Sequence, residues 1–230
     1  MSCSVTLKKL SYQNGGDTLC QNIDLNVTHK EKIAIIGPNG CGKTTLLNII
    51  AGLQEKQSGV LELFHNEIET PKDYKPFRDM VGYLFQNSDN QFLAPIVIDD
   101  VAFSLLSGGM EKEEALLKAR MMLEDLGIVH LKDKVVYNLS GGEKKLVALA
   151  GVLVTEPKLM LLDEPTNGLD LNMQLKLVEI LKNIDKSIII VSHNRDFIDS
   201  IVNNIYEITT EGLKLIATPL TPTKQHSHSH

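Results

Sequence analysis

The stretch KIAIIGPNGCGKTTLLNIIAGL, from Lys32 to Leu53, decides how the chain folds. Its apolar beginning predicts a short buried strand, and the apolar residues that recur from Leu46 at helical spacing predict a helix that ends near Gly52. Between the two lies GPNGCGKT, in which three glycines allow the backbone to turn sharply. A strand, a glycine-rich turn and a helix thus follow one another directly, which is the context that a phosphate-binding loop requires.

A loop of this kind binds phosphate because its backbone N–H groups turn toward the phosphate oxygens and the helix N-terminus adds positive potential. Lys43 is expected to bridge the β- and γ-phosphates of a nucleotide, and the Thr44 hydroxyl to ligate Mg²⁺. The predicted nucleotide-binding residues are Gly37, Pro38, Asn39, Gly40, Cys41, Gly42, Lys43, Thr44 and Thr45. A glycine-rich turn without a ligand is the alternative, and the complete match in this context disfavours it.

The sequence on both sides of this stretch predicts an α/β fold. In the N-terminal third, short β-rich runs suggest a sheet of mixed direction; they are residues 5–12, 23–28, 32–37 and 59–64. The near-continuous apolar runs KLMLLDEP and SIIIVSHN predict strands buried on both faces of a parallel sheet. Helices are predicted at 171–184, at 195–205 and through the middle of the chain, roughly Asp99 to Leu126. The whole pattern predicts a parallel core with a helical insertion between its two halves.

The composition of the 230-residue chain limits the classes of protein to which it can belong. With 43% hydrophobic residues it can bury a sizeable core, and its net charge of -6 argues against a protein that binds nucleic acid through phosphate contacts. The longest apolar run, Leu146 to Val154, has roughly half the length of a membrane-spanning helix. The first residues lack the pattern of a secretory signal, and Cys3, Cys20 and Cys41 have no metal-ligand spacing, so a reduced cytoplasm is predicted.

Two acids end one of the apolar runs, in LMLLDEP. A carboxylate at the C-terminal end of a strand beside the phosphate loop is placed to hold Mg²⁺ through water, and this role is assigned to Asp163. Glu164 is then placed to accept a proton from the attacking water, as a general base does. The alternative is that the two acids only cap the following turn, and without the phosphate loop that alternative would be favoured.

Two further motifs complete a resemblance to a known family. LSGGE, Leu139 to Glu143, precedes a helical run and predicts a second anion-binding helix N-terminus, and VSH ends the last apolar strand. The phosphate loop, LSGGE, LMLLDEP and VSH together resemble the nucleotide-binding subunit of an ABC transporter, which implies ATP and Mg²⁺ as cofactors. The resemblance covers about residues 1 to 210. It implies a P-loop NTPase fold with a RecA-like parallel-sheet core, an N-terminal antiparallel β-subdomain and a helical insertion.

The resemblance also implies that the chain works as a dimer. Two subunits pair head to tail around two ATP molecules, so that Ser140, Gly141 and Gly142 contact the γ-phosphate held in the other subunit. Asp170, in NGLD, lies in the loop that links the two sites.

Four residues are implied to be catalytic: Glu164, His193, Gln86 and Lys43. His193 reaches the γ-phosphate and orients Glu164 and the water. Tyr12, upstream of the phosphate loop, matches the aromatic residue that stacks on adenine, although a tyrosine at a strand end often only packs.

The segment YLFQNSDNQF, from Tyr83 to Phe92, is predicted to link the ATP site to the rest of the transporter. Taken alone it is a polar loop after a strand, but Gln86 matches the glutamine of the family's Q-loop, which senses Mg²⁺ and the attacking water. The amides after Gln86 are predicted to line a hinge that faces a membrane partner, and a groove beside the loop to receive a helix from that partner. Asp99 and Asp100 are predicted to meet an arginine of this helix, or to cap their own helix.

A narrower resemblance concerns the type of transporter. NSDNQF, DDVAF and LSGGEKK with LAGVLV resemble the ATPases of energy-coupling-factor importers, which serve vitamins and transition-metal ions such as cobalt and nickel. The tail residues His226, His228 and His230 are able to hold Ni²⁺, Co²⁺ or Zn²⁺ together, or else form a solvated tail. An ATPase subunit for cobalt or nickel uptake is therefore predicted. Another cargo, such as a vitamin or an amino acid, is the alternative, and a non-transport ABC ATPase is a weaker one.

The predicted organisation is one nucleotide-binding domain in residues 1–217, with a helical insertion at about 87–150 and a disordered tail in 218–230. Predicted partners are a second ATPase subunit, identical or not, a transmembrane coupling protein at the Q-loop groove and a substrate-binding membrane subunit, with no nucleic acid. The predicted location is the cytoplasmic face of the cell membrane, as a peripheral protein.

Three positions depart from the family pattern. Cys41 replaces a frequent serine, Glu143 replaces a glutamine and Leu146 replaces an arginine, and the change at Leu146 puts one polar contact of the helix in doubt.

Overall fold

A central sheet of six strands carries the fold of this computed structural model, which describes residues 3–14 and 17–218. The strands follow the order β10-β9-β3-β8-β7-β6, in which β9, β3, β8, β7 and β6 are parallel and β10 is antiparallel to β9. They are β3 (Lys32–Ile36), β6 (Val81–Leu84), β7 (Leu159–Asp163), β8 (Ser187–Val191), β9 (Asn204–Thr209) and β10 (Gly212–Ala217). The predicted parallel core is confirmed.

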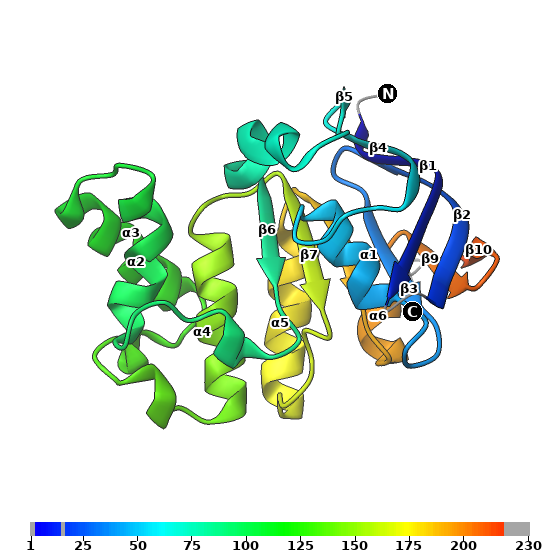
Figure 1. Cartoon of the computed structure of the whole chain (residues 1–230). Coiled ribbons are helices and arrows are strands. Elements are labelled where there is room, and N and C mark those ends of the chain that lie inside the picture. The colour runs from blue at the N-terminus through cyan, green and yellow to red at the C-terminus, as the bar shows by residue number, and fades with distance from the viewer. Residues whose placement is uncertain (1–2, 15–16, 219–230) are drawn as a thin grey trace, which may run out of the picture.

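A second sheet, drawn in dark blue and cyan in Figure 1, lies at one end of the molecule. Its order is β2-β1-β4-β5, and its strands are antiparallel throughout. They are β1 (Cys3–Asn14), β2 (Asp17–Thr28), β4 (Ser58–Leu63) and β5 (Asn66–Glu67). The predicted run 32–37 instead forms β3 of the parallel sheet. The N-terminal third was predicted to form one sheet of mixed direction, and its strands are divided between two sheets.

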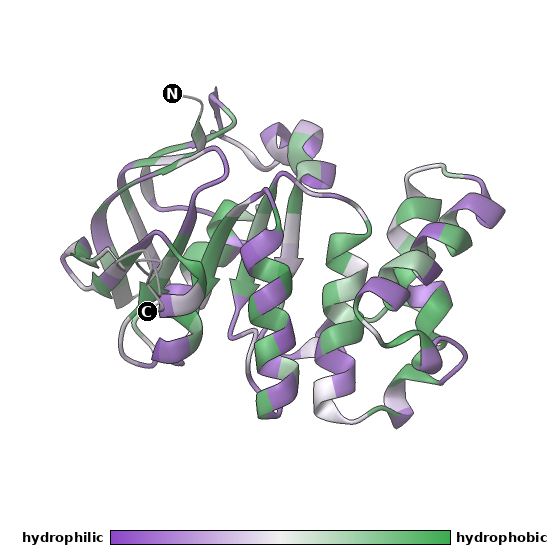
Figure 2. Ribbon diagram, turned by 180° about the vertical axis from the view of Figure 1, so that it is seen from behind, coloured by the Kyte–Doolittle hydropathy of each residue, from purple (hydrophilic) through white to green (hydrophobic). Residues whose placement is uncertain are grey.

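Successive residues of β7 and β8 belong to two different hydrophobic cores. Leu159 and Leu161 join a core formed with α1 (Lys43–Ile50) and the antiparallel sheet. Met160 and Leu162 join a second core, whose helices include α4 (Gly141–Leu153), α5 (Leu171–Asn183) and α6 (Arg195–Ile201). Every residue of β7 and β8 is buried, which confirms that these apolar runs are strands covered on both faces. The residue types agree with this burial: in Figure 2 the central strands are mostly green (hydrophobic), whereas α5 in front of them alternates green and purple.

The middle of the chain forms two helices rather than one continuous helical region. They are α2 (Val97–Ser107) and α3 (Lys112–Asp125), and Figure 1 shows them beside α4, at the end of the molecule away from the antiparallel sheet. Gly108 caps α2, and Gly109 follows with a φ of 88°, a backbone conformation that favours glycine. Four short 3₁₀ segments complete the described helices: η1 (Pro71–Met80), η2 (Ser88–Asn90), η3 (Val129–Leu131) and η4 (Val136–Asn138).

No helix within residues 3–14 and 17–218 combines the length and the apolar character needed to cross a membrane. The three histidines at positions 226, 228 and 230 lie outside the described residues, as does the rest of 219–230. The predicted disorder of the tail, its metal binding and the predicted domain boundaries therefore stay predictions.

The packing of β6 against α4 can be tested at a glycine. A methyl group added at Gly82 would lie 2.6 Å from Cγ1 of Val152 and 2.8 Å from Cγ of Pro157, so we expect Gly82→Ala to lower the free energy of unfolding by about 1–3 kcal/mol. Gly151 lies inside α4 and has open space around it, so Gly151→Ala is expected to raise that free energy by about 0.5–1 kcal/mol. Denaturant unfolding of both variants measures the difference, and a neutral Gly82→Ala would contradict the packing.

Candidate functional site

A cleft of about 350 Å³ lies where the parallel strands end, and all four predicted catalytic residues line it. It brings together side chains from four separate segments of the chain: Lys43, Thr44, Gln86, Asp163, Glu164 and His193. Asn39, Gly40, Gly42 and Thr45 line it too. The sequence places these residues far apart, and the parallel order of β3, β8, β7 and β6 places them at one edge of the sheet.

The phosphate loop has the backbone shape that its glycines allow. Gly37, Gly40 and Gly42 have φ values of 153°, 79° and 95°, which side chains on L-residues rarely permit. The Lys43 ammonium donates hydrogen bonds to the carbonyl oxygens of Gly37 and Pro38, both at 2.8 Å, and the residue is 7% exposed. The lysine is therefore held within the loop, where it adds positive charge to the helix N-terminus.

Thr44 and Asp163 meet at the base of the cleft, and their oxygens fit a divalent cation. The Thr44 hydroxyl donates to Oδ2 of Asp163 at 2.7 Å. Oδ1 of Asp163 is buried and is the one such side-chain atom within the described residues that has no hydrogen-bond partner. Burial raises the pKa of Asp163, while the Thr44 bond and the charges of Lys145 and Lys43 oppose the rise. An orphaned carboxylate oxygen beside a hydroxyl is the oxygen set that Mg²⁺ prefers, so the residues present fit this ion.

Glu164 follows β7 in a strained backbone conformation, with a φ of 46°. Its Oε1 lies 3.3 Å from Nε2 of His193, and its Oε2 accepts the backbone N–H of His193 at 3.4 Å. Burial raises the pKa of the Glu164 carboxyl, and the neighbouring His193 partly offsets this rise. The turn after Glu164 closes through its backbone carbonyl, which accepts the Asn167 N–H at 3.2 Å. The turn therefore needs no capping by either carboxylate, and both acids face the cleft.

Gln86 is exposed and lines the cleft, but the amides after it have a different arrangement from the predicted one. Asn87 Oδ1 accepts the Asp89 N–H at 3.0 Å. Gln91 turns inward, where its Nε2 donates to the Ala148 carbonyl at 3.0 Å and its Oε1 accepts the Phe85 N–H at 3.3 Å. The prediction that these amides line a hinge facing a partner is therefore wrong for Gln91, because both ends of its amide are bonded to the chain's own backbone. For Asn87, whose side chain is exposed, it stays a prediction.

The residues of LSGGE and NGLD lie at the starts of two helices. Ser140 caps α4, with its Oγ accepting from the Glu143 N–H at 3.3 Å and its N–H donating to Glu143 Oε2 at 2.8 Å. Asp170 caps α5 by accepting the Met173 N–H at 2.8 Å. Ser140, Gly141, Gly142 and Asp170 are not among the described residues that line the cleft. Their contact with a second nucleotide across a dimer stays a prediction.

Tyr12 is a correction to the predicted site. Its side chain is fully buried, its hydroxyl donates to the Gly42 carbonyl at 3.0 Å, and burial raises its pKa far above the ordinary value. A methyl group at Gly42 would lie 2.8 Å from Cε2 of this ring. Tyr12 therefore supports the phosphate loop from beneath and has no free face for adenine. Leu19 of β2 lines the cleft on this side, and a single leucine in a mostly polar strand gives no sequence signal for such a role.

Two further residues, Gln174 and Lys145, make contacts that were not predicted from the sequence. Gln174 of α5 donates from Nε2 to the Leu169 carbonyl at 2.9 Å and accepts from Asn194 Nδ2 at 2.9 Å, which connects the NGLD loop to the residue after His193. Lys145 of α4 is buried, and its ammonium donates to two carbonyls of the Q-loop, Phe85 at 3.0 Å and Gln86 at 2.8 Å.

The structure also shows the surroundings of two residues that depart from the family pattern, Leu146 and Cys41. Leu146 is 2% exposed and packs in the core under α4, so an apolar side chain suits its position, and Lys145 beside it makes a polar contact from the helix. Cys41 is half-buried, with its sulfur 3.9 Å from the Lys43 ammonium.

Asp100 accepts the N–H groups of Leu93 and Ala94 at 2.6 and 2.9 Å. Asp100 thus lies in the first turn of α2 and bonds to the loop before the helix, whose N-cap is Ile96, so it does not cap the helix. Asp99 is exposed, and the contact of either acid with a partner's arginine stays a prediction.

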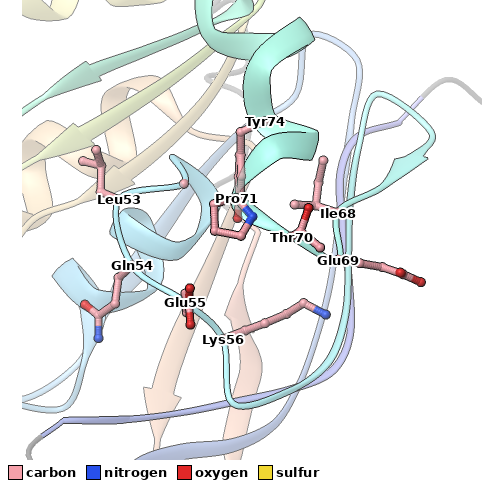
Figure 3. Close-up of a pocket in the computed structure, with 10 residues that line it drawn as sticks. Leu53, Gln54, Glu55, Lys56, Ile68, Glu69, Thr70, Pro71 and Tyr74 are labelled. Atoms are coloured by element: carbon pink, nitrogen blue, oxygen red, sulfur yellow. The ribbon is translucent and has the colours of Figure 1, made fainter.

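A second depression, of about 390 Å³, lies between the end of α1 and η1 (Figure 3). Gln54, Glu55, Lys56 and Thr70 line it, and the Tyr74 hydroxyl at its side donates to the Ile49 carbonyl at 2.6 Å. It contains no part of the phosphate loop and neither of the two acids after β7. The cleft at the strand ends is therefore the candidate site.

Comparisons with known proteins agree with this geometry. The sequence model of the family described as ABC transporter matches residues 20–167. An uncharacterized ABC transporter ATP-binding protein of Haemophilus influenzae is 39% identical over 204 residues, which cover 89% of this chain and 94% of that protein. Among solved structures, CbiO1 of Clostridium perfringens, described as part of the ABC transporter complex CbiONQ, is 33% identical with a TM-score of 0.83, covering 95% of this chain and 90% of its own.

A second solved structure is an ATP-binding cassette in a dimeric, post-hydrolysis state with ADP and phosphate bound. It is 25% identical, has a TM-score of 0.85, and covers 94% of this chain and 99% of its own. The two structures confirm the predicted α/β fold of a P-loop NTPase.

The support of the loop by Tyr12 gives a matched pair of variants. Gly42→Ala would meet the Tyr12 ring and a φ of 95°, whereas Gly40→Ala would meet only an unfavourable φ of 79° in open space. We expect Gly42→Ala to weaken ATP binding by more than about tenfold, and Gly40→Ala to weaken it by less than about fivefold, since strain alone costs about 1 kcal/mol. Equilibrium binding of a fluorescent ATP analogue measures both, and equal losses would show that Tyr12 does not restrict Gly42.

Proposed function

The chain belongs to the ABC transporter family as an ATP-binding subunit, and on this premise we propose that it hydrolyses ATP, as a dimer, to drive uptake through a membrane partner. The observation that carries the proposal is the meeting of Lys43, Thr44, Asp163, Glu164 and His193 in one cleft at the strand ends. These residue types in this arrangement supply a phosphate cradle, an oxygen set for a cation and a general base.

The chemistry we propose assigns one task to each group. The loop backbone and Lys43 bind the phosphates of ATP. Thr44, Asp163 and Gln86 would hold Mg²⁺, which supplies positive charge to the phosphate oxygens when bound. Glu164 accepts a proton from water as the water oxygen attacks the γ-phosphorus, and the bond to the leaving oxygen of ADP breaks. The 3.3 Å contact between Glu164 and His193 supports the role of the histidine in orienting this base.

We propose a head-to-tail dimer because the N-terminus of α4 offers anion-binding groups away from the chain's own cleft. Ser140 and Gly141 are exposed there, and Gly142 is buried behind them. In the proposed dimer, Ser140, Gly141 and Gly142 contact the γ-phosphate of the second subunit, and Asp170 lies in the loop between the two sites. The similarity to a cassette solved as a dimer with ADP and phosphate supports this arrangement.

We propose the energy-coupling-factor type of importer, with cobalt or nickel ions as cargo. Support comes from the motifs NSDNQF, DDVAF and LSGGEKK, and from similarity to CbiO1, which is described as part of the complex CbiONQ. The partners in this proposal are a second ATPase subunit, a transmembrane coupling protein at the Q-loop groove and a substrate-binding membrane subunit. The ATPase would lie peripherally on the cytoplasmic face of the membrane, and residues 1–217 would form its nucleotide-binding domain with an insertion at about 87–150.

The role of Glu164 can be tested by removing its charge. Glu164→Gln keeps the shape of the side chain but cannot accept a proton, so we expect hydrolysis to fall by about a hundredfold or more while ATP binding is kept. The variant should accumulate as an ATP-bound dimer, which size-exclusion chromatography with light scattering detects. Glu179→Gln, at an exposed position of α5, is the control and should hydrolyse ATP at the normal rate. Near-normal turnover of Glu164→Gln would exclude Glu164 as the general base.

The transporter type can be tested by purifying the chain from membranes with its associated subunits. We expect a complex with a transmembrane protein, and ATP-dependent uptake of radioactive cobalt or nickel when the complex is placed in proteoliposomes. Glu164→Gln in the same complex should abolish the uptake, because transport depends on hydrolysis. A complex that carries a vitamin-binding membrane subunit and transports no metal would reject the proposed cargo.

A further inference from the structure

Lys145 is a buried charge to which the proposed function gives no task. Within the described residues, Lys43 and Lys145 are the two basic side chains that are buried, at 7% and 3% exposure. A buried lysine is rare, because the ammonium loses its hydration and must find hydrogen-bond acceptors inside the protein. Lys43 belongs to the phosphate loop, whereas Lys145 lies on a different helix.

The acceptors of Lys145 are backbone carbonyls of the Q-loop. The ammonium donates to the Phe85 carbonyl at 3.0 Å and to the Gln86 carbonyl at 2.8 Å. Bonds of this kind, with a charged donor, are stronger than bonds between neutral groups. Burial lowers the pKa of Lys145, and the nearby charges of Asp163 and Glu164 oppose the decrease. The lysine therefore fixes the backbone of the residue whose side chain lines the cleft.

Neighbouring positions of α4 hold the same loop. Lys144 forms an ion pair with Asp89, with Nζ and Oδ1 2.7 Å apart, on the surface of the molecule. The Ala148 carbonyl accepts from Gln91, whose Oε1 in turn accepts the Phe85 N–H. On either side of this segment the chain is anchored by the buried residues Leu84 and Ser88. Because several contacts tie this loop to α4, a movement of the helix is transmitted to the backbone of Gln86.

The two ends of this connection serve different ATP molecules in the proposed dimer. The helix that carries Lys145 is capped by Ser140, which is assigned to the ATP of the second subunit in the proposed dimer. Gln86 belongs to the chain's own cleft. We propose that Lys145 is a positioning residue that makes the placement of Gln86 in one ATP site depend on the placement of α4 against the other. This inference rests on the proposed dimeric ATPase and assigns to it the contact that couples its two sites.

The contact itself is tested on the full chain without nucleotide, by hydrogen exchange. Lys145→Met has a similar length but no charge and no donor, so we expect amide exchange in residues 83–92 to become about tenfold faster, while α3 exchanges as before. Lys144→Met, the control, removes the surface ion pair and should change this exchange by less than about threefold. Lys145→Gln replaces the methionine variant if that variant does not fold, as judged by thermal unfolding. Unchanged exchange in a folded Lys145 variant would overturn the proposal.

The positioning role is tested by kinetics of the same variants. In Lys145→Met we expect kcat to fall about tenfold with the KM for ATP within about threefold of normal, more Mg²⁺ needed for half-maximal rate, and a Hill coefficient for ATP near one. Lys145→Arg retains a charged donor and should restore the normal Mg²⁺ dependence. Equal losses in Lys144→Met and Lys145→Met, or a failure of arginine to rescue, would reduce Lys145 to a packing residue. Absence of hydrolysis by the unaltered chain would reject the proposed function, and hydrogen exchange would still decide on Lys145.

Discussion

The parallel pairing of β3, β8 and β7 is the constraint on which the site depends. Ile35 of β3 and Asp163 of β7 both pair with Val191 of β8, so the three strands end level at one edge of the sheet. A different functional group lies at the end of each strand: the glycine-rich phosphate loop follows β3, Asp163 and Glu164 lie at the end of β7, and His193 follows β8. Because side chains alternate along a strand, a shift of one residue would turn Asp163 to the other face and away from Thr44.

The charges at this edge are nearly balanced before any nucleotide binds. Asp163 and Glu164 are both buried, and two buried ammonium groups, those of Lys43 and Lys145, act on Asp163 from different elements. Lys43 comes from the loop that receives the phosphates, whereas Lys145 comes from α4. A nucleotide adds negative charge beside Lys43, and a divalent cation at Thr44 and Asp163 offsets part of it. Burial disfavours the charged form of both acids, so in the proposed ATP complex a divalent cation at Thr44 and Asp163 would stabilise the ionised carboxylates.

The sequence predicts the parts of this site that depend on local pattern. The strand, glycine turn and helix around residues 32–50 are read from apolar spacing alone, and they place Lys43 and Thr44 correctly in the cleft. Tyr12 was misassigned because alternation along a strand does not say which face is covered, and α1 with the phosphate loop covers the tyrosine face. Lys145 was not predicted, and Gln91 was misassigned, for a related reason. From the sequence alone, polar residues in a helix or a loop are expected to face solvent. Only tertiary packing brings the Phe85 carbonyl to Lys145 and the Ala148 carbonyl to Gln91.

Glu143 shows how the start of α4 balances two requirements. Its carboxylate completes the cap of the helix, and the Ser140 N–H and hydroxyl hold its pKa below the ordinary value. A carboxylate in the first turn stabilises the helix, but it also repels the phosphate that the proposed dimer brings to Ser140. Lys134, with its ammonium 3.7 Å from Oε1 of Glu143, offsets part of that repulsion. The acid is held sideways against the Ser140 backbone, which leaves the exposed Gly141 at the helix end open to an anion. In the proposed dimer, α4 is thus capped without a ligand and still presents its N-terminus to the second nucleotide, and Lys145 on the same helix connects the position of α4 to Gln86.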